Sequence, residues 1–421
     1  MPKNTTKIPE GWKIQNISDV CNVLIGGTPS RNKPEFWDTQ KESNNVWVSI
    51  RDLGVAGKYI SDSAEYISEE GVRRSNVKLL PKDTVLMSFK LTIGRMAITK
   101  TKLYTNEAIA GFAIKNKNEL DANYLYNILP TLAYEVDTAV KGKTLNKEKL
   151  LNTRIVLPPL PEQNKIAEIL GTVDEEIEKT EKIIEETVRL KSGLMKDLFT
   201  KGIGHAKFKK TKLGMTPDDW QVVSIKDAPI ELVDGDRGVN YPKSFDFTFG
   251  GYCLFLSNKN VKDDQFIFSD LQFISKDKDE ALGKGRLQRL DVVLTTRGTV
   301  GNVAFYNDDV TFENIRINSG MLILRAVGEL SPKYLYHLMK SPLLKKKYID
   351  VTSGSAQPQL PIKSLGQIFI PIPPEDEQEK IVEACESIDK KFLIYKEIRN
   401  NLTKLKKGLL EDLLSGRVRA R

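Results

Sequence analysis

The sequence predicts an α+β protein. Two mixed α/β domains are separated by two long helices that form an antiparallel coiled coil, and the whole is a pseudo-two-fold internal repeat. Three observations predict this architecture. Segments of the second half match segments of the first half in the same order, each copy begins with short β-rich runs, and each copy ends in a long stretch with helical periodicity.

The repeat extends over almost the whole chain. Trp12–Asp19 matches Trp220–Asp227 at an offset of 208 residues. Ile155–Pro158 matches Ile368–Pro371 at an offset of 213, and from Glu162 onward the offset stays at 215. Because these matches keep their order with little drift, they indicate two copies of one unit.

The first part of each copy is predicted to be mixed. The runs Asn45–Ile50, Thr84–Ser88 and Val292–Thr296 are rich in β-branched or apolar residues. Glycine, proline, asparagine and aspartate bound them, as is typical of short strands.

The second part of each copy is predicted to be one helix, which begins near Pro161 in the first copy and near Pro374 in the second. About 39 residues at a rise of 1.5 Å make a helix of roughly 58 Å. Apolar residues alternate at spacings of four and three, as in a coiled-coil seam. The predicted seam consists of Ile166, Leu170, Val173, Ile177, Ile184, Leu194, Leu198, Ile381, Cys385, Ile388, Phe392, Tyr395, Leu402, Leu409 and Leu413.

The simplest partner for one helix is the other, in antiparallel pairing; the alternative is that each helix packs on its own domain. Lys191 and Lys406 interrupt equivalent seam positions, where their long side chains can reach solvent or mark the point at which the helices diverge. The predicted boundaries are residues 1–161 for the first mixed domain, 162–200 for its helix, 201–217 for a linker, 218–374 for the second mixed domain and 375–421 for the last helix.

Composition excludes several classes of protein. The 421 residues carry a net charge of +8 and contain no apolar run of membrane-spanning length. The first residues lack the apolar core of a secretory signal, and Cys21, Cys253 and Cys385 lie far apart. We therefore expect a cytoplasmic protein with free thiols.

We expect no catalytic centre and no metal site in this chain. His205 and His337 are the only histidines, and each alone is more often structural or solvated. The sequence has no HExxH motif, no Walker A loop, no G-x-S-x-G elbow and no Asn-Pro-Pro-aromatic motif of amino-methyltransferases. These absences argue against hydrolysis, nucleotide binding and methyl transfer by this chain.

Basic charge is concentrated in the two mixed domains. Residues 1–161 carry a net charge of +6 and residues 200–374 carry +5, whereas the first helix carries −4. This distribution fits mixed domains that meet a polyanion and helices that meet protein. The lysine runs 207–212 and 345–347 and the tail Arg417–Arg421 are interpreted as solvated surface.

Several glycine-containing loops combine flexible backbone with side chains that can contact DNA. Arginine can donate two hydrogen bonds to guanine, and asparagine or glutamine can pair with adenine. Each loop alone is better explained as an ordinary turn, but the set on two repeated basic domains favours DNA contact. The candidate DNA-binding residues are Thr28, Ser30, Arg31, Arg95, Lys143, Asp236, Arg237, Lys284, Arg286, Arg297, Gln357 and Gln359.

The layout and two motifs resemble the specificity subunit of type I restriction–modification enzymes. The motifs are Leu157-Pro-Pro-Leu-Pro-Glu-Gln163 and Ile370-Pro-Ile-Pro-Pro-Glu-Asp-Glu-Gln378, each followed by a long helix that ends in a Leu-x-x-Asp-Leu sequence. Gly26–Ser30, Gly235–Gly238 and Thr295–Gly298 look like segments of that family's target-recognition domains.

The resemblance implies two target-recognition domains that each bind one half of a split double-stranded DNA sequence. It implies that the paired helices set the spacing and dock methyltransferase subunits, two in number, and restriction subunits. S-adenosylmethionine, ATP and Mg would then belong to those partners, with no cofactor in this chain. The alternatives are a specificity subunit of a methylation-only system, a stand-alone DNA-modifying enzyme and a coiled-coil adaptor. Methyl transfer or DNA cutting by the purified chain would favour the enzyme, and absence of salt-sensitive DNA binding would favour the adaptor.

Overall fold

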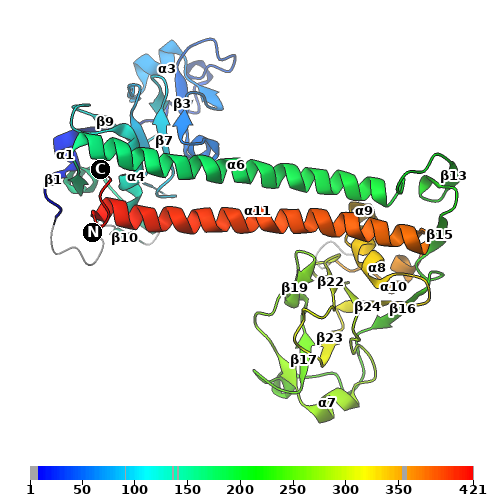
Figure 1. Cartoon of the computed structure of the whole chain (residues 1–421). Coiled ribbons are helices and arrows are strands. Elements are labelled where there is room, and N and C mark those ends of the chain that lie inside the picture. Colours follow the sequence, from blue (N-terminus) through cyan, green and yellow to red (C-terminus); the bar gives the residue numbers. More distant parts are fainter. Residues whose placement is uncertain (1–7, 91, 135–136, 140–141, 353–357, 421) are drawn as a thin grey trace. The chain divides into compact units, whose positions relative to one another are not determined.

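The structure is a computed structural model that describes residues 8–90, 92–134, 137–139, 142–352 and 358–420. The chain separates into two compact units (Figure 1). Unit 1 comprises Met1–Glu181 and Ile398–Arg421, and unit 2 comprises Lys182–Glu397. Each unit therefore contains one mixed domain and a part of both long helices, α6 (Leu160–Leu198) and α11 (Glu375–Ser415).

The mixed part of unit 1 is built from short elements. Its helices are α1 (Ile17–Val20), α2 (Ile50–Val55), α3 (Glu69–Arg74), α4 (Ala122–Ile128) and α5 (Lys147–Asn152), with 3-10 turns at Pro34–Phe36 and Leu129–Thr131. Its strands are β1 (Lys13–Asn16), β2 (Cys21–Ile25), β3 (Val46–Val48), β4 (Tyr59–Ile60), β5 (Glu65–Tyr66), β6 (Val85–Ser88), β7 (Met96–Thr99), β8 (Tyr104–Thr105), β9 (Ile109–Ile114), β10 (Asp137–Ala139), β11 (Gly142–Thr144) and β12 (Arg154–Leu157).

The mixed part of unit 2 has a similar inventory. Its helices are α7 (Lys276–Ala281), α8 (Pro332–Met339), α9 (Pro342–Val351) and α10 (Ile362–Gly366), with 3-10 turns at Ser244–Asp246 and Asn258–Asn260. Its strands are β13 (Phe208–Thr211), β14 (Gly214–Pro217), β15 (Gln221–Ser224), β16 (Ile230–Asp234), β17 (Cys253–Leu256), β18 (Val261–Lys262), β19 (Gln265–Phe266), β20 (Phe273–Ile274), β21 (Val292–Thr295), β22 (Val303–Phe305), β23 (Ile315–Ile317), β24 (Met321–Ala326) and β25 (Phe369–Ile372).

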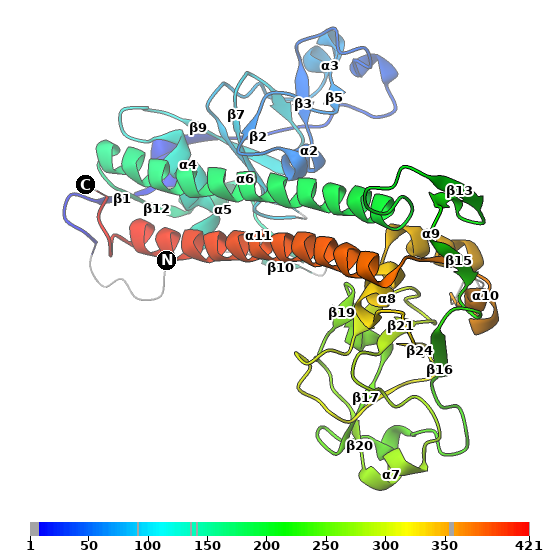
Figure 2. The ribbon, with the colours of Figure 1, turned by 45° about the vertical axis from the view of Figure 1, so that its right-hand side comes forward.

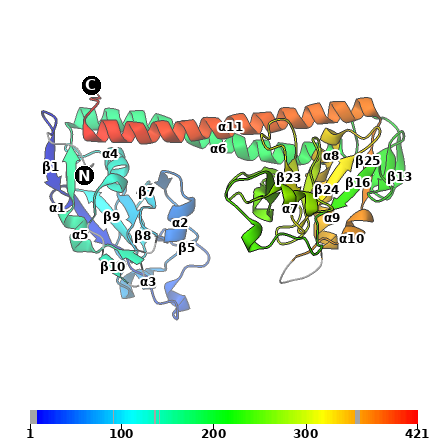
Figure 3. The same cartoon turned by 90° about the horizontal axis from the view of Figure 1, so that it is seen from below.

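Each mixed domain contains strands and short helices (Figure 3). The order of four strands is the same in the main sheets of the two domains. Unit 1 has a five-stranded sheet in the order β2-β9-β6-β7-β4, and unit 2 has a four-stranded sheet in the order β16-β24-β21-β22. A second sheet, β5-β3-β8 or β20-β17-β23, contains one parallel pair in each unit, β3 with β8 and β17 with β23. The repeat inferred from the sequence is thus also a structural repeat.

The central strands are buried on both faces, which explains their continuous apolar composition. In β6, Val85 and Met87 belong to one hydrophobic cluster, whereas Leu86 between them belongs to another. In β21, Val292 and Val293 divide between two clusters in the same way. Alternation with period two therefore places neighbouring side chains in different layers of the core.

The strand that precedes each long helix corrects one part of the predicted alignment. Arg154 of β12 pairs with Asn16, and Phe369 of β25 pairs with Ser224. Because Asn16 and Ser224 are related by the offset of 208 residues, Arg154 corresponds to Phe369 at an offset of 215 and not 213. The sequence match of Ile155–Pro158 was therefore displaced by two residues, since similar Ile-Pro segments overlap there.

A buried glutamine fastens each long helix to its own domain. The Gln163 side chain donates to the carbonyls of Pro158 and Glu119, both at 2.8 Å, and accepts from the amide of Asp121 at 3.1 Å. Gln378 repeats this pattern with the carbonyl of Pro373 at 3.0 Å and the amide of Ser331 at 2.8 Å. The glutamine that ends each of the motifs Leu157–Gln163 and Ile370–Gln378 therefore anchors the start of a long helix to its own domain.

In each unit the two long helices contact each other and run antiparallel. In unit 1, α6 and α11 lie side by side (Figure 2). Ile166 and Leu170 of α6 share a cluster with Leu413 of α11, and Lys406 Nζ lies 2.5 Å from Asp174. In unit 2, Lys191 Nζ lies 2.6 Å from Asp389. The two lysines that interrupt the apolar stripe therefore form ion pairs between the helices, where Asp174 and Asp389 are themselves equivalent at the offset of 215.

The predicted seam residues are all buried or half-buried along both helices. Ile166, Leu170 and Leu198 are buried on α6, and Ile381 and Cys385 are buried on α11. One continuous coiled coil over the full length of both helices stays a prediction.

Candidate nucleic-acid interface

In unit 2, several strand ends meet at one edge of the domain. Asp234, the last residue of β16, pairs with Leu322, and Thr295, the last residue of β21, pairs with Met321. Strands β16 and β21 therefore end where β24 begins. The parallel strands β17 and β23 end at the same edge, because only residues 318–320 separate Ile317 from β24. The loops that follow these strands are gathered there.

Asp236 joins two of the loops that were predicted to contact DNA. Its carboxylate accepts hydrogen bonds from the backbone amides of Gly238 at 2.7 Å, Gly283 at 2.8 Å and Lys284 at 3.4 Å. These bonds, that from Gly238 first, lower the pKa of Asp236. The structure thus gives this carboxylate a loop-organising role, while the Lys284 side chain is exposed.

Two predicted arginines of unit 2 are held by neighbouring groups. Arg237 Nη2 lies 3.1 Å from Asp234 and donates to the Ser319 carbonyl at 3.3 Å. Arg286 Nη2 donates to Asn314 at 2.8 Å and lies 3.3 Å from Asp279, which is buried. Their guanidinium groups are preorganised, but part of their hydrogen-bonding capacity is already used.

Arg297 differs from these two. Its backbone forms a β-bridge with Gln359, and its carbonyl accepts a hydrogen bond from the Asn258 side chain. Arg297 is half-buried, and within the described part of the chain its guanidinium has no hydrogen bond or ion pair. Gln359 is exposed beside it, whereas Gln357 lies outside the described residues.

In unit 1, the predicted loop Gly26–Arg31 leaves the corresponding edge. The Thr28 hydroxyl donates to Glu107, and this hydrogen bond is the main cause that lowers the pKa of the Glu107 carboxyl. The Ser30 carbonyl accepts from the Trp37 indole at 3.2 Å. The first bond fixes the loop against the residues that precede β9, and the second fixes it to Trp37, which follows the 3-10 turn Pro34–Phe36.

Arg31 is committed to contacts within unit 1. Its guanidinium forms a two-point ion pair with Glu65, in which Nη2 and Oε2 are 3.0 Å apart. It also lies 3.7 Å from the ring centroid of Trp37, a cation–π geometry. Arg95 Nη1 donates to the Ile50 carbonyl at 3.0 Å. Lys143 lies in strand β11, and its side chain is not among those described.

Glycines at the start of these loops are required by close backbone approach. A Cβ atom on Gly26 would lie 2.1 Å from the carbonyl oxygen of Thr105, and one on Gly235 would lie 2.1 Å from that of Asn318. The two glycines follow equivalent strands, β2 and β16. The loops therefore leave both domains along the same path.

Sequence reasoning missed two clusters around buried glutamates at the start of the long helices. Glu162 accepts from the Trp12 indole at 2.9 Å and from Arg419 at 2.7 Å. The interpretation of the C-terminal tail as solvated surface is therefore wrong for Arg419, because its guanidinium neutralises a carboxylate that is only 7% exposed. Pairing at a buried carboxylate could not be inferred from the tail alone.

The equivalent cluster in unit 2 contains a histidine. Glu377 accepts from the Trp220 indole at 2.7 Å, and His205 Nε2 lies 2.8 Å from its other oxygen. His205, Asp219 and Glu377 together are close enough to hold a metal ion. However, both oxygens of Glu377 already accept hydrogen bonds, and the guanidinium of Arg419 occupies the equivalent place in unit 1. The arrangement thus fits a basic side chain beside a buried carboxylate better than a metal centre.

The remaining titratable candidates are buried. Burial lowers the pKa of His337 to about 3, so that its imidazole is neutral. Cys21, Cys253 and Cys385 are free and buried, and burial raises the pKa of each thiol to about 12. These thiols are protonated at neutral pH.

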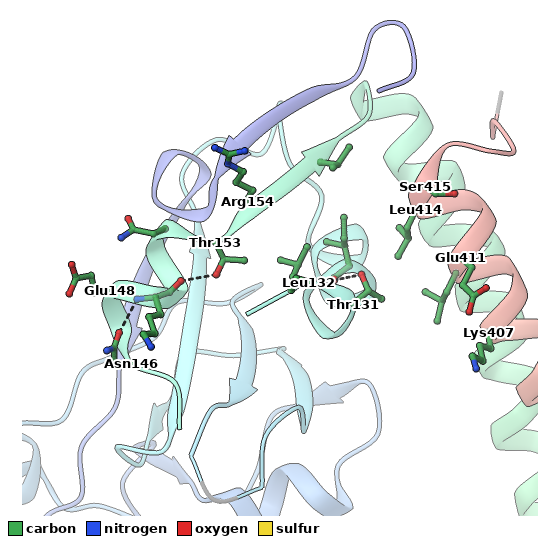
Figure 4. Close-up of a pocket in the computed structure, with 16 residues that line it drawn as sticks. Thr131, Leu132, Asn146, Glu148, Thr153, Arg154, Lys407, Glu411, Leu414 and Ser415 are labelled. Atoms are coloured by element: carbon green, nitrogen blue, oxygen red, sulfur yellow. Dashed lines mark hydrogen bonds between the residues drawn. The ribbon is translucent and has the colours of Figure 1, made fainter. Parts of the chain in front are cut away.

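A groove of about 1040 Å³ lies in unit 1 between α5, the turn after α4 and the last part of α11 (Figure 4). Leu132, Leu410 and Leu414 contribute apolar surface, and Arg154 and Lys407 contribute charge. It is lined by none of the predicted DNA-binding residues that the structure describes.

In the described residues no helix has both the length and the apolarity needed to cross a membrane.

The fold and the interface define a class of protein in which one chain carries two equivalent mixed domains, each with loops gathered at the same edge. A family model, described as the type I restriction modification DNA specificity domain, matches residues 9–186 and again residues 217–404. The chain belongs to this family. It is a specificity subunit and not an enzyme of the system.

Relatives and solved structures agree with the family assignment. The chain is 27% identical to the type I restriction enzyme MjaVIII specificity subunit of Methanocaldococcus jannaschii, over 99% of this chain and 95% of the relative. It is 20% identical to the EcoKI specificity subunit of Escherichia coli K12, over 91% of this chain and 83% of the relative.

Two solved structures share the fold. One, from work on complex assembly and conformational transition of the type I R-M system, has a TM-score of 0.63 and 17% identity, covering 98% of this chain and 100% of that chain. The other, the S subunit from M. genitalium, has a TM-score of 0.55 and 15% identity, covering 98% of this chain and 97% of that chain.

Proposed function

We propose that this specificity subunit binds a double-stranded DNA sequence in two half-sites, one for each mixed domain, and that its long helices dock methyltransferase and restriction subunits. Methyl transfer, with S-adenosylmethionine, and DNA cutting, with ATP and Mg, belong to those partners. The observation that carries the proposal is the repeated edge: Gly26 and Gly235 start equivalent loops after equivalent strands.

The charge distribution supports DNA as the ligand of these edges. The mixed domains carry net positive charge, and the loops at the edge of unit 2 hold Arg237, Lys284 and Arg297. Cationic side chains on loops can contact phosphates and base edges together. Since each unit has its own edge, the two domains can bind two different short sequences.

Exposed apolar side chains on the long helices support protein partners. Leu190 of α6 is 57% exposed, and Leu393 and Leu405 of α11 are 60% and 51% exposed. Leu393 is adjacent to Ile394, which is 46% exposed, and contiguous exposed apolar surface is typical of sites that a partner covers. We infer that the methyltransferase subunits, two for a two-part site, cover these residues.

The experiment that tests the function is mapping of methylated adenines in DNA from cells that express this chain with its methyltransferase subunit. We expect one two-part sequence with a fixed spacer. Methylation without a defined sequence, or methylation that does not depend on this chain, would contradict the proposal. The purified chain alone should neither methylate nor cut DNA.

A further inference from the structure

The internal repeat allows the two edges to be compared position by position. If the two domains bind different half-sites, side chains that contact bases should differ between the copies. Side chains that contact what every half-site shares, the phosphate backbone, should keep their charge and their place. The structure fixes which positions are equivalent, and two of them carry a cation in both units.

The first equivalent position lies just after strand β3 in unit 1 and just after strand β17 in unit 2, each of which belongs to a parallel pair. Ser49 follows β3 and Ser257 follows β17. The Ser49 amide donates to the Asp52 carboxylate at 2.8 Å, and the Ser257 amide donates to the Asn260 side chain at 2.9 Å. A helical turn that begins after the serine therefore follows both strands, as the first turn of α2 in unit 1 and as the 3-10 turn Asn258–Asn260 in unit 2.

Arg51 and Lys259 occupy the same place in these turns, two residues after the serine. Both side chains are exposed. Neither has a hydrogen bond or an ion pair with any residue that the structure describes. Two unpaired cations thus stand at one equivalent position.

The second equivalent position follows the central strands β6 and β21. Ser88 is the last residue of β6, and its hydroxyl accepts a hydrogen bond from the Arg95 amide at 2.9 Å. Thr295 is the last residue of β21, and its hydroxyl accepts a hydrogen bond from the Asn302 amide at 3.0 Å. Two residues after these hydroxyls stand Lys90 and Arg297.

In each unit the two turns are tied together. In unit 1, Arg95 Nη1 donates to the carbonyl of Ile50 at 3.0 Å. In unit 2, the Asn302 side chain donates to the carbonyl of Val261 at 3.1 Å, and Asn258 donates to that of Arg297. Each edge therefore presents two cations on adjoining turns with a fixed backbone.

The identities of the four residues indicate which part of DNA they contact. At the first position unit 1 has an arginine and unit 2 has a lysine. At the second position unit 1 has a lysine and unit 2 has an arginine. Two-point recognition of a guanine requires the fork of arginine, whereas a phosphate accepts either cation as a charge. Lys90 rests 5.3 Å from the Phe89 ring centroid, and Arg297 has no partner among the described residues. By contrast, Arg31 and Arg237 are already paired with carboxylates.

We propose that Arg51 and Lys90 in unit 1, and Lys259 and Arg297 in unit 2, bind DNA phosphates at equivalent places of the two half-sites. This inference rests on the proposed function. It assigns these four side chains to positioning the DNA, and leaves sequence discrimination to residues that differ between the copies.

The test measures DNA binding by the full chain, assembled with its methyltransferase subunits, as a function of salt. Two duplexes are used, one with the recognised sequence and one without it. We expect Arg51→Ala, Lys90→Ala, Lys259→Ala and Arg297→Ala each to weaken binding to both duplexes by the same factor. Each change should also reduce the slope of log affinity against log salt by about 0.9, as expected for one lost phosphate contact. Arg51→Lys and Arg297→Lys should keep the slope of the wild type.

Lys165 and Lys380 provide matched controls. They are also equivalent, at the offset of 215, and exposed, but each forms an ion pair on its own helix, with Glu168 at 2.9 Å and with Asp376 at 3.2 Å. Lys165→Ala and Lys380→Ala should leave the slope unchanged. An unchanged slope in the four test variants, or weakening confined to the recognised duplex, would overturn the inference. Failure of the wild type to prefer the recognised duplex would instead contradict the proposed function.

Discussion

The indole of Trp12 donates a hydrogen bond of 2.9 Å to the carboxylate of Glu162, at the start of the long helix α6. The equivalent bond in unit 2, from Trp220 to Glu377, is 2.7 Å. A basic side chain from a different segment completes each cluster: Arg419 from the C-terminal tail or His205 from the segment after α6. The tail in unit 1 and that segment in unit 2 therefore each supply a side chain that contacts the buried glutamate.

The first prediction concerns the tail. Arg419→Ala should lower the free energy of unfolding of unit 1 by about 1.5–3 kcal/mol, because it leaves the buried Glu162 carboxylate with fewer charged donors. Denaturant unfolding monitored by tryptophan fluorescence measures this change. Arg417→Ala is the control: Arg417 is exposed and pairs with Asp412 at 2.8 Å, so its loss should cost less than about 1 kcal/mol. Equal effects of the two changes would contradict a stabilising role for the pairing of Arg419 with the buried Glu162.

The second prediction concerns pH. The hydrogen bond from Arg419 is the largest cause that lowers the pKa of Glu162 below its ordinary value of 4.5. A carboxyl whose pKa is lower in the folded state contributes stability above its unfolded pKa and loses it as the pH falls through its folded pKa. The wild type should therefore lose more stability than Arg419→Ala on acidification below about pH 4.5. Parallel stability curves for the two proteins would argue against this linkage.

The third prediction concerns Gly235. Gly235→Ala should destabilise unit 2 by about 1–3 kcal/mol, since the added Cβ would lie 2.1 Å from the Asn318 carbonyl oxygen and would overpack the loop. Gly250→Ala provides the matched control, because a Cβ at Gly250 meets no atom within 4 Å. Thermal unfolding of both variants measures the difference. A neutral Gly235→Ala would show that the loop can move away without cost.

The fourth prediction is that the two mixed domains bind their half-sites independently. Exchange of residues 1–161 for the same domain of another family member should change one half of the methylated sequence and leave the other half as it was. The reason is that each unit has its own complete edge and core. Sequencing of methylated adenines decides the matter; a change in both halves, or in neither, would refute independent recognition.

The fifth prediction is that the long helices set the spacer. Four residues inserted after Glu181 in α6 and four after Glu397 in α11 add about 6 Å of helix, close to two base pairs at 3.4 Å each. Both insertions lie at the boundary of the two units, so the ion pairs Asp174–Lys406 and Lys191–Asp389 are kept. We expect a spacer that is longer by one or two base pairs with both half-sites unchanged. An active variant with the original spacer would show that the helices do not determine the distance.

The candidate interface was only partly accessible from the sequence. Glycine-containing loops with polar side chains marked the right kind of segment, and Gly26 and Gly235 are indeed required by close backbone approach. The sequence could not distinguish Arg31, whose guanidinium is paired with Glu65, from Arg297, which has no partner in the described residues. Ion pairing depends on which side chains the fold brings within a few ångströms, and pairs such as Arg31 and Glu65 are far apart in the chain.

The sequence by itself determined the repeat, the two long helices and the apolar stripe along them, because a period of two or 3.6 and a constant offset are properties of the chain order. It also placed the strands β3, β6 and β21 within the predicted β-rich runs. The tertiary structure alone decided the exact offset of β12 and β25, the ion pairs of Lys191 and Lys406, and the burial of the Arg419 partner. These features depend on hydrogen-bond register and on charges that meet only after the chain has folded, and no local pattern in the sequence records them.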